Sequence, residues 1–350
     1  MPDLAKRFPE NPLIMPRHVN SSREGLRVQL VLNPGAFRFE GKTWLIMRVA
    51  EHPEQREGYA RTVVADPDEP GGVAILEFDL NDPDVEYEDP RHITYKGESY
   101  LSSISHLRLA SSEDGVHFEI EDQPVITAQG PMESYGIEDC RVTELDGRYW
   151  LTYTVASPRG IGVALASTVD WREFTRHGVI LPPTNKDCAI FPGKANGRYA
   201  MLHRPIGVFL GGPFIWLAYS DDMEHWGHHH CVVRTRSDMW DSARVGAGAA
   251  PIYTDEGWLE IYHGANHEHR YCLGALLLDL EDPCKVIARS EEPIMEPLAD
   301  YERAGFFGEV VFTNGHIVDG DTITMYYGAS DAVICGATLS IREILDSLGR

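Results

Sequence analysis

The sequence contains no long hydrophobic run and little helical periodicity. No stretch approaches the roughly 20 consecutive apolar residues that a membrane helix needs, and the N-terminal segment lacks the apolar core of a signal peptide. Basic residues are scarce, with 31 Lys and Arg against 54 Asp and Glu, so the formal net charge is −23. That charge repels phosphate backbones and anionic lipids, which argues against a nucleic-acid partner or a membrane surface.

Paired cysteine motifs are also absent. The six cysteines are scattered without a Cys-x-x-Cys pair, so we expect neither a disulfide framework nor a zinc site. The run His228-His229-His230 suits a solvated turn better than metal coordination, in which side chains converge on one point. We therefore expect no metal, no cofactor, reduced thiols and a cytoplasmic location.

One strand-forming unit recurs along the chain. A turn glycine precedes a strand rich in Tyr, Trp and Leu in six places, and these glycines are 50 to 63 residues apart. They are Gly41, Gly97, Gly147, Gly197, Gly257 and Gly320. The Asp-Gly and Asn-Gly pairs among them favour two-residue hairpin turns, because both central positions need a positive φ.

This repeat predicts an all-β fold. Self-similarity at this period, built from strands only, is typical of β-propeller blades, and a β-sandwich is the alternative. Six copies indicate five or six blades in a single catalytic domain over residues 1–350. The last residues, LSIREILDSLGR, predict a short C-terminal helix.

In a propeller the ligand site lies on the central axis, so polar residues from several repeats are candidates. Glu138 and Asp139 stand beside Arg141, either as an acid with its orienting cation or as a buried ion-pair network. Two neighbouring segments carry further polar groups, namely Lys186-Asp187 and His203-Arg204. These side chains can bind an anion or several sugar hydroxyls, or they can belong to a solvated surface. Trp240 is a sugar-stacking platform or a core residue.

Three further carboxylates are candidates near the C-terminus. Glu309 stands among Phe, Gly and Val, where an ionised side chain is costly unless it is paired or functional. Glu268 lies between two histidines, and Asp331 follows the aromatic pair Tyr326-Tyr327. Because motifs for serine, cysteine and phosphate-loop chemistry are missing, carboxylate acid–base catalysis on a carbohydrate is the chemistry that these residues favour.

Several motifs in fixed order resemble glycoside hydrolase family 130. They are GIEDCRVTELDGRYWLTYT, NKDCAIFPGKANGRYAMLHRP, MWDSARVGAGAAPI, GWLEIYHGANHEHRYCLGALLLDLEDP, FFGEVVFTNG and YYGASD. The resemblance implies a five-bladed β-propeller that acts on β-mannosides with inversion. It also implies that Asp139 is the proton donor, acting through a sugar hydroxyl, although Cys140 replaces the proline of the family motif.

The family contains phosphorylases and a smaller group of hydrolases, and the resemblance implies different roles in each. In a phosphorylase, Lys186, His203 and Arg159 would bind phosphate. In a hydrolase, Glu268 and Glu309 would activate water, and a carboxylate at Glu309 would repel phosphate.

We expect an inverting exo-β-1,2-mannosidase with Asp139, Glu268 and Glu309 as its catalytic residues. A phosphorylase that releases α-mannose 1-phosphate is the alternative, and a non-catalytic sugar-binding propeller is a third. The expected partner is a small mannoside, and the family's tendency to oligomerise leaves a homo-oligomer open. The residues expected to position the sugar are Asn33, Arg48, Arg141, Lys186, Asp187, His203, Arg204, Trp240 and Asp331.

Overall fold

The computed structural model describes residues 3–69, 71–89, 91–207 and 209–350. Nearly all regular structure in these ranges is β-strand, as expected, and no helix there is long and apolar enough to cross a membrane. The helices are η1 (Pro16–His18), α1 (Asp300–Arg303) and α2 (Ile341–Ser347). Helix α2 confirms the expected C-terminal helix, and the Ser340 hydroxyl caps it by accepting a hydrogen bond from the Glu343 backbone N–H at 3.1 Å.

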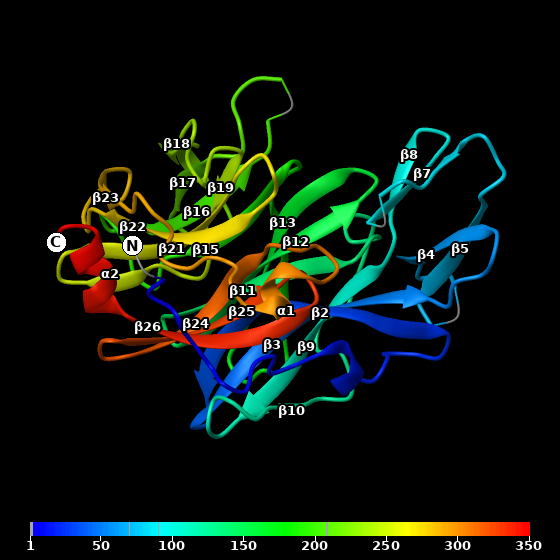
Figure 1. Cartoon of the computed structure of the whole chain (residues 1–350), viewed down its shortest axis with the longest axis horizontal. Helices are drawn as coiled ribbons and strands as arrows, with labels where there is room; N and C mark the ends of the chain where they lie inside the picture. Colours follow the sequence, from blue (N-terminus) through cyan, green and yellow to red (C-terminus); the bar gives the residue numbers. More distant parts are fainter. Residues whose placement is uncertain (1–2, 70, 90, 208) are drawn as a thin grey trace.

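Most strands belong to five antiparallel sheets (Figure 1). In hydrogen-bonded order, the first sheet contains β10 (Glu119–Ile120), β9 (Ile104–Ser112), β3 (Lys42–Pro53) and β2 (Leu26–Phe39). The second contains β11 (Ile137–Leu145), β12 (Arg148–Ser157), β13 (Gly160–Thr168) and β14 (Thr175–Leu181), and the third contains β15 (Asn185–Ile190), β16 (Tyr199–Pro205), β17 (Ile215–Ser220) and β18 (Gly227–Val233).

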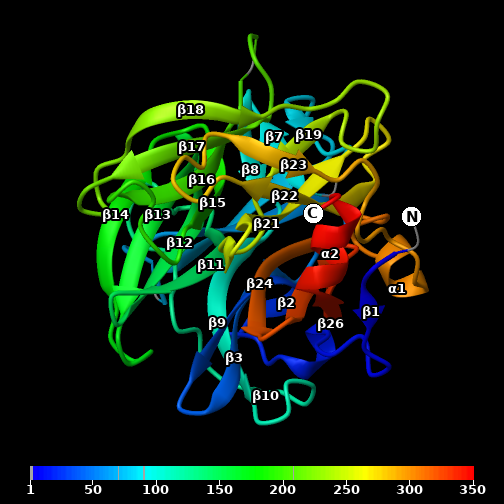
Figure 2. The ribbon, with the colours of Figure 1, turned by 90° about the vertical axis from the view of Figure 1, so that its left-hand side faces the viewer.

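The remaining two sheets are built from the C-terminal part of the chain and from its N-terminus. The fourth contains β19 (Arg244–Gly246), β21 (Gly257–Ala265), β22 (Tyr271–Leu278) and β23 (Val286–Arg289), with β20 (Ile252–Thr254) also paired to β21. The fifth contains β24 (Val311–Asp319), β25 (Thr322–Ala329), β26 (Val333–Ser340) and β1 (Lys6–Arg7). The first and last strands of the chain are therefore neighbours, and both termini lie on the same side of the molecule in Figure 2.

Two of the three predicted Asp-Gly and Asn-Gly hairpin turns have the expected backbone, whereas at Asp319-Gly320 only the glycine has a positive φ. At the turn between β11 and β12, Asp146 and Gly147 have φ values of +55° and +71°. Asn196 and Gly197 have φ values of +51° and +75° between β15 and β16. Two consecutive positive φ values are typical of type I′ turns, which match the twist of the flanking strands.

One copy of the repeat lies outside the five sheets. The copy at Gly97 forms the turn between two strands of a small sheet, inserted between β3 and β9. This insertion projects at the right of Figure 1 and explains why six copies accompany five sheets. It contains β4 (Tyr59–Ala65) paired with β5 (Val73–Asp79), and β6 (Val85–Glu86), β7 (His92–Tyr95) and β8 (Glu98–Leu101) in the second small sheet.

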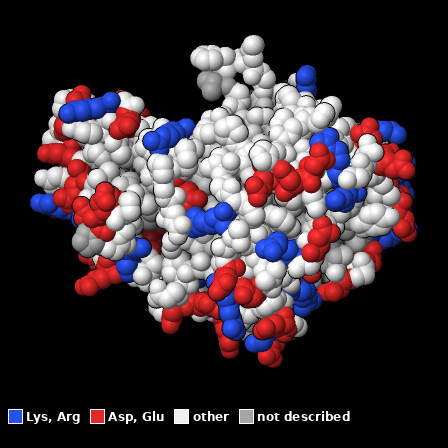
Figure 3. Space-filling model, turned by 180° about the vertical axis from the view of Figure 1, so that it is seen from behind, with Lys and Arg blue, Asp and Glu red and all other residues white. Residues whose placement is uncertain are grey.

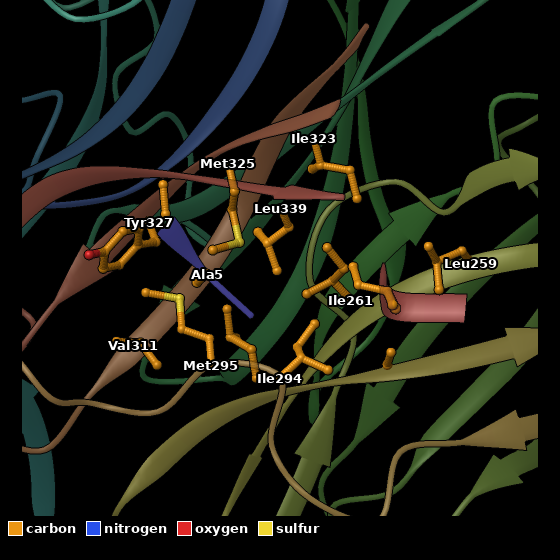
Figure 4. Close-up of a cluster of buried hydrophobic side chains, with 14 of the residues drawn as sticks. Ala5, Leu259, Ile261, Ile294, Met295, Val311, Ile323, Met325, Tyr327 and Leu339 are labelled. Carbon is orange, nitrogen blue, oxygen red and sulfur yellow. The ribbon is translucent and has the colours of Figure 1, made fainter. Parts of the chain in front are cut away.

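Apolar side chains fill the space between neighbouring sheets. Figure 4 shows one such cluster, in which Leu259 and Ile261 of β21 face Ile323 and Met325 of β25. Each of these four side chains is buried. Burial of a Leu, Ile or Met side chain contributes about 1.5 to 3 kcal/mol, so such clusters fix each sheet against the next.

Strands β2, β11, β15, β19 and β24 each form an edge of their sheet. These edges converge, because β2 contacts both β24 and β11, and β11 contacts β15. Polar residues on β2, β11 and β15 are thereby brought together although they are far apart in the sequence.

Candidate active site

A polar cavity of about 210 Å³ receives side chains from all five sheets. Five cationic side chains and three carboxylates line it, and two of the cations, Arg48 and Arg91, also pair with the carboxylates of Glu138 and Asp89 outside the lining. The basic lining contrasts with the chain as a whole, whose formal charge is −23 and whose acidic side chains spread over the face in Figure 3. The charged lining residues are Arg48, Arg91, Lys186, Arg204, Arg244, Asp139, Asp187 and Asp331.

Local irregularities of the edge strands aim several of these groups into the cavity. The pairing register shifts within β2, β11 and β15, next to Asn33, Asp139 and Asp187. These three residues have φ values of +47°, +51° and +53°. A bulge bends a strand and redirects a side chain, and Asn and Asp tolerate the left-handed conformation better than most residues. The sequence therefore supplies both the polar group and the backbone freedom at each bulge.

Asp139 is held by two neighbours at the cavity wall. Its carboxylate accepts hydrogen bonds from Asn33 Nδ2 at 3.0 Å and from Arg48 Nη1 at 3.2 Å, and its side chain is almost fully buried. Burial works to raise the pKa of Asp139, but the charges of Arg48, Lys186 and Arg141 hold it below the ordinary value. Without a ligand, Asp139 is therefore ionised near neutral pH.

Asp187 lies against two arginines and a histidine that come from three sheets. Its carboxylate lies 3.0 Å from Arg204 Nε, 3.2 Å from Arg141 Nη2 and 3.4 Å from His263 Nε2. Although burial opposes ionisation, these groups keep the pKa of Asp187 well below its usual range. Arg141 also donates to the Gly248 backbone carbonyl at 2.7 Å, so it ties the strands together behind the cavity and does not line it.

Two of the cavity cations have no carboxylate partner within the described ranges. No carboxylate oxygen there lies within 4.0 Å of Lys186 Nζ or of the Arg244 guanidinium, whereas Arg48 and Arg204 are paired. Arg244 Nη1 donates instead to the Tyr271 hydroxyl at 2.8 Å. The charges of Lys186 and Arg244 are thus free to attract an anionic ligand.

Asp331 differs from the other two carboxylates. Burial raises the pKa of Asp331 to about 6, and the charge of Asp139 adds to this effect while Arg48 opposes it. Its side chain is partly open to the cavity but otherwise surrounded by protein. Asp331 therefore holds a proton at higher pH than an ordinary carboxyl does.

The structure brings most of the predicted residues to the cavity. Seven of them line it: Asn33, Arg48, Asp139, Lys186, Asp187, Arg204 and Asp331. His203 does not, because it is buried behind the wall, with its Nδ1 3.1 Å from Asn185 Oδ1 and its Nε2 2.9 Å from His229 Nδ1. Burial lowers the pKa of His203 to about 3, so this imidazole is neutral.

Arg159 and Trp240 also lie outside the cavity lining. Arg159 is exposed in a turn and donates to the Pro131 carbonyl at 3.1 Å. Trp240 packs on the backbone of two strands: a Cβ added at Gly264 or Gly274 would stand 2.6 or 2.7 Å from its ring. The indole of Trp240 is therefore packed against these strands and does not face the cavity.

Sequence reasoning missed several lining residues. Arg244 lies in the motif MWDSARVGAGAAPI, which was interpreted through its small residues and Trp240 and not through its arginine. His263 lies in the motif that begins GWLEIYHGA. Arg91 comes from the insertion and belongs to no repeat. Only Arg244 and His263 had a signal, namely a basic residue inside a motif already singled out.

Glu268 and Glu309 are not brought together at the cavity. Glu268 is exposed in the turn between β21 and β22. The Glu309 carboxylate lies 3.3 Å from Arg270 Nε and 3.2 Å from Arg303 Nε, and its side chain is 38% exposed. Neither residue lines the cavity, so the expected glutamate pair around a water molecule is absent.

Comparison with known proteins supplies the family. The model described as beta-1,4-mannooligosaccharide phosphorylase, of glycoside hydrolase family 130, matches residues 88–350. The chain belongs to glycoside hydrolase family 130. It is 42% identical to a beta-1,2-mannobiose phosphorylase of Listeria innocua over 346 aligned residues, which are 98% of this chain and 98% of that protein.

A further relative and a solved structure agree with this assignment. A 1,2-beta-oligomannan phosphorylase of Thermoanaerobacter is 43% identical over 248 residues, which are 70% of this chain and 82% of that protein. The solved structure of the beta-1,2-mannobiose phosphorylase from Listeria innocua, in complex with beta-1,2-mannobiose, has a TM-score of 0.94 at 41% identity and covers 99% of both chains.

The expectation of hydrolysis is wrong. These relatives are all named phosphorylases. The structure is consistent with these names, because Glu309 pairs with Arg270 and Arg303 and Glu268 is exposed in a turn, and neither lines the cavity. The chain is an enzyme of a mannoside-processing family, and the phosphorylase alternative is the reading that the comparisons favour.

Proposed function

We propose that the chain is a β-1,2-mannoside phosphorylase. Inorganic phosphate attacks the anomeric carbon of the terminal mannosyl unit, and the products are α-mannose 1-phosphate and the shortened acceptor. The names of relatives that are 42% and 43% identical support the reaction and the linkage.

One structural observation carries the proposal: the cavity holds free positive charge. Lys186 and Arg244 line the cavity without carboxylate partners in the described ranges. A phosphate dianion needs such charge-assisted donors, whereas a neutral water nucleophile needs a carboxylate base. The unpaired charges of Lys186 and Arg244 in this cavity therefore favour phosphate as the attacking group.

Asp139 is the proposed proton donor. As the bond between the anomeric carbon and the leaving oxygen breaks, its proton passes through a mannosyl hydroxyl to that oxygen. The new bond joins the anomeric carbon to a phosphate oxygen, and the proton of the monohydrogen phosphate is then available to reprotonate Asp139. The reaction consumes no net proton.

Phosphate itself favours the acidic form of this donor. The charges of Arg48, Lys186 and Arg141 keep the pKa of Asp139 low despite burial. A bound dianion near Lys186 offsets part of that positive potential, so the pKa of Asp139 rises when phosphate binds. Binding of phosphate thus increases the fraction of Asp139 that is protonated and able to donate.

The five sheets are the proposed blades of a five-bladed β-propeller. Four of the sheets contain four antiparallel strands and one contains five, and their convergent edges supply residues to one cavity. Residues 1–350 then form one catalytic domain, of which the insertion between β3 and β9 is a part. The six cysteines, all outside disulfides, support a reducing cytoplasmic location.

The test is product analysis by ³¹P and ¹H NMR with β-1,2-mannobiose, with and without phosphate. We expect α-mannose 1-phosphate with phosphate and no turnover without it. Equal release of free mannose in both conditions would refute the proposal. Asp139→Asn is expected to lose about 10²- to 10⁴-fold in kcat. Asp146→Asn is the matched control, since Asp146 also has a positive φ of +55° but forms the hairpin turn at the far end of β11.

A further inference from the structure

The cavity rim contains a continuous wall of packed side chains. The Arg244 guanidinium contacts Tyr271, the Tyr271 ring lies 6.5 Å from the Phe307 ring, and Phe307 lies 4.9 Å below the Arg91 guanidinium. All four residues line the cavity. Two aromatic rings therefore separate an arginine of the fourth sheet from an arginine of the insertion.

The two arginines differ in their free charge. Arg91 is neutralised by Asp89, whose carboxylate accepts from Arg91 Nη2 at 2.6 Å and from Arg91 Nε at 2.9 Å. Arg244 has no carboxylate within 4.0 Å in the described part of the chain, and its partner is the Tyr271 hydroxyl. The Arg244 end of the wall thus attracts an anion, while the Arg91 end presents a neutralised planar group.

The Arg91 end has the properties of a sugar platform. A guanidinium plane above a phenyl ring gives a flat surface, and the remaining N–H groups of Arg91 can donate to hydroxyls. The Arg91 side chain is 53% exposed, so it borders solvent at the rim rather than the closed floor of the cavity. A sugar unit that must enter and leave at every turnover needs such a position.

The stereochemistry places the leaving sugar relative to phosphate. In an inverting displacement the nucleophile and the leaving group occupy opposite faces of the anomeric carbon. If phosphate binds at the free cations Lys186 and Arg244, the leaving mannose cannot share that end of the wall. The Arg91–Phe307 end is the part of the wall that remains.

We propose that Arg91 and Phe307 bind the acceptor sugar, the mannose that leaves in phosphorolysis and enters in the reverse reaction. The proposal rests on the proposed phosphorylase function. It makes the insertion between β3 and β9 a determinant of acceptor specificity, because the insertion supplies both Arg91 and the Asp89 that fixes it.

The test measures the reverse reaction, in which α-mannose 1-phosphate and mannose give β-1,2-mannobiose and phosphate. For Arg91→Ala we expect the KM for mannose to rise about 3- to 30-fold, with the KM for α-mannose 1-phosphate changed less than twofold. Phe307→Leu keeps an apolar side chain but loses the ring, and we expect the same selective rise. Arg56→Ala is the matched control, because Arg56 stacks on Tyr59 at 4.5 Å within the insertion but does not line the cavity.

The outcomes separate this inference from the function on which it rests. If the wild-type enzyme forms no β-1,2-mannobiose from these substrates, the proposed function fails. If it does, and Arg91→Ala leaves the KM for mannose unchanged, the acceptor assignment is refuted. A rise in the KM for phosphate or α-mannose 1-phosphate alone would also refute it and would assign Arg91 to the anion. Arg91→Lys keeps the charge and loses the plane, so it decides the question if Arg91→Ala is unstable.

Discussion

Replacing Lys186 by Met tests the central electrostatic argument. Lys186 lines the cavity on β15 and has no carboxylate within 4.0 Å in the described ranges, so its charge is available to phosphate. Met keeps an unbranched side chain of similar length but removes the charge and its hydrogen bonds. The change therefore weakens phosphate binding while leaving the shape of the cavity nearly intact.

The size of the effect follows from the type of contact. A hydrogen bond between charged groups contributes about 1.5 to 3 kcal/mol. At about 1.4 kcal/mol per factor of ten, this loss raises the KM for phosphate about 10- to 150-fold. We expect the KM for β-1,2-mannobiose to change less than about threefold, because a neutral sugar loses no ion pair.

The assay is the initial rate of α-mannose 1-phosphate formation, with phosphate varied at saturating β-1,2-mannobiose. Lys194→Met is the matched control: Lys194 is exposed in the turn after β15 and lies over the Tyr199 ring at 4.4 Å, outside the cavity. A KM for phosphate within twofold of the wild-type value in Lys186→Met would refute the reasoning. A variant that fails equally toward both substrates would contradict it as well, since a general loss of activity is not a loss of anion binding.

Three further predictions concern residues of different roles. The double variant Glu268→Ala/Glu309→Gln is expected to keep the rate of phosphorolysis within about twofold of the wild-type rate, since exposed ion pairs contribute at most about 1 kcal/mol. Loss of turnover in this variant would show that these glutamates are catalytic. Asp331→Asn is expected to raise the free energy of unfolding at pH 7 by up to about 3 kcal/mol, and urea titration would show equal stabilities below pH 4. This sign follows because a carboxyl with its pKa raised from 3.8 to about 6 binds its proton more tightly when folded, so its contribution to stability falls as pH rises through that window; a gain of equal size at both pH values would contradict it. Trp240→Ala is expected to lower stability by about 2 kcal/mol without changing the KM for β-1,2-mannobiose, and a selective rise in that KM would show that the indole binds sugar.

Much of the site was predictable because its residues carry two independent signals. Asp139 and Asp187 are polar, and they also stand where a left-handed backbone is needed, which Asp tolerates. The hairpins at Gly147 and Gly197 were likewise predictable, because Asp-Gly and Asn-Gly pairs favour such turns. Such features depend only on neighbouring residues and can therefore be predicted from the sequence.

The error at Glu309 has a physical cause. Its apolar sequence neighbours indicated a buried carboxylate, but its side chain is 38% exposed and pairs with Arg303, six residues earlier, and with Arg270 on the far side of β22 and β23. A sequence pattern reports only the residues on either side, whereas the charge that stabilises a carboxylate can come from any distance along the chain.

The sequence alone determined the β-strand content, the hairpin turns, the terminal helix and the family to which the chain belongs. The tertiary structure decided which charges face the cavity and which are neutralised, and so which nucleophile the cavity favours. Free charge is a property of pairs of side chains: Lys186 and Arg48 are both basic, yet only Arg48, on β3, has carboxylates of β11 at 2.7 and 3.2 Å. Because that pairing arises from strands that meet only in the folded chain, no local pattern encodes it.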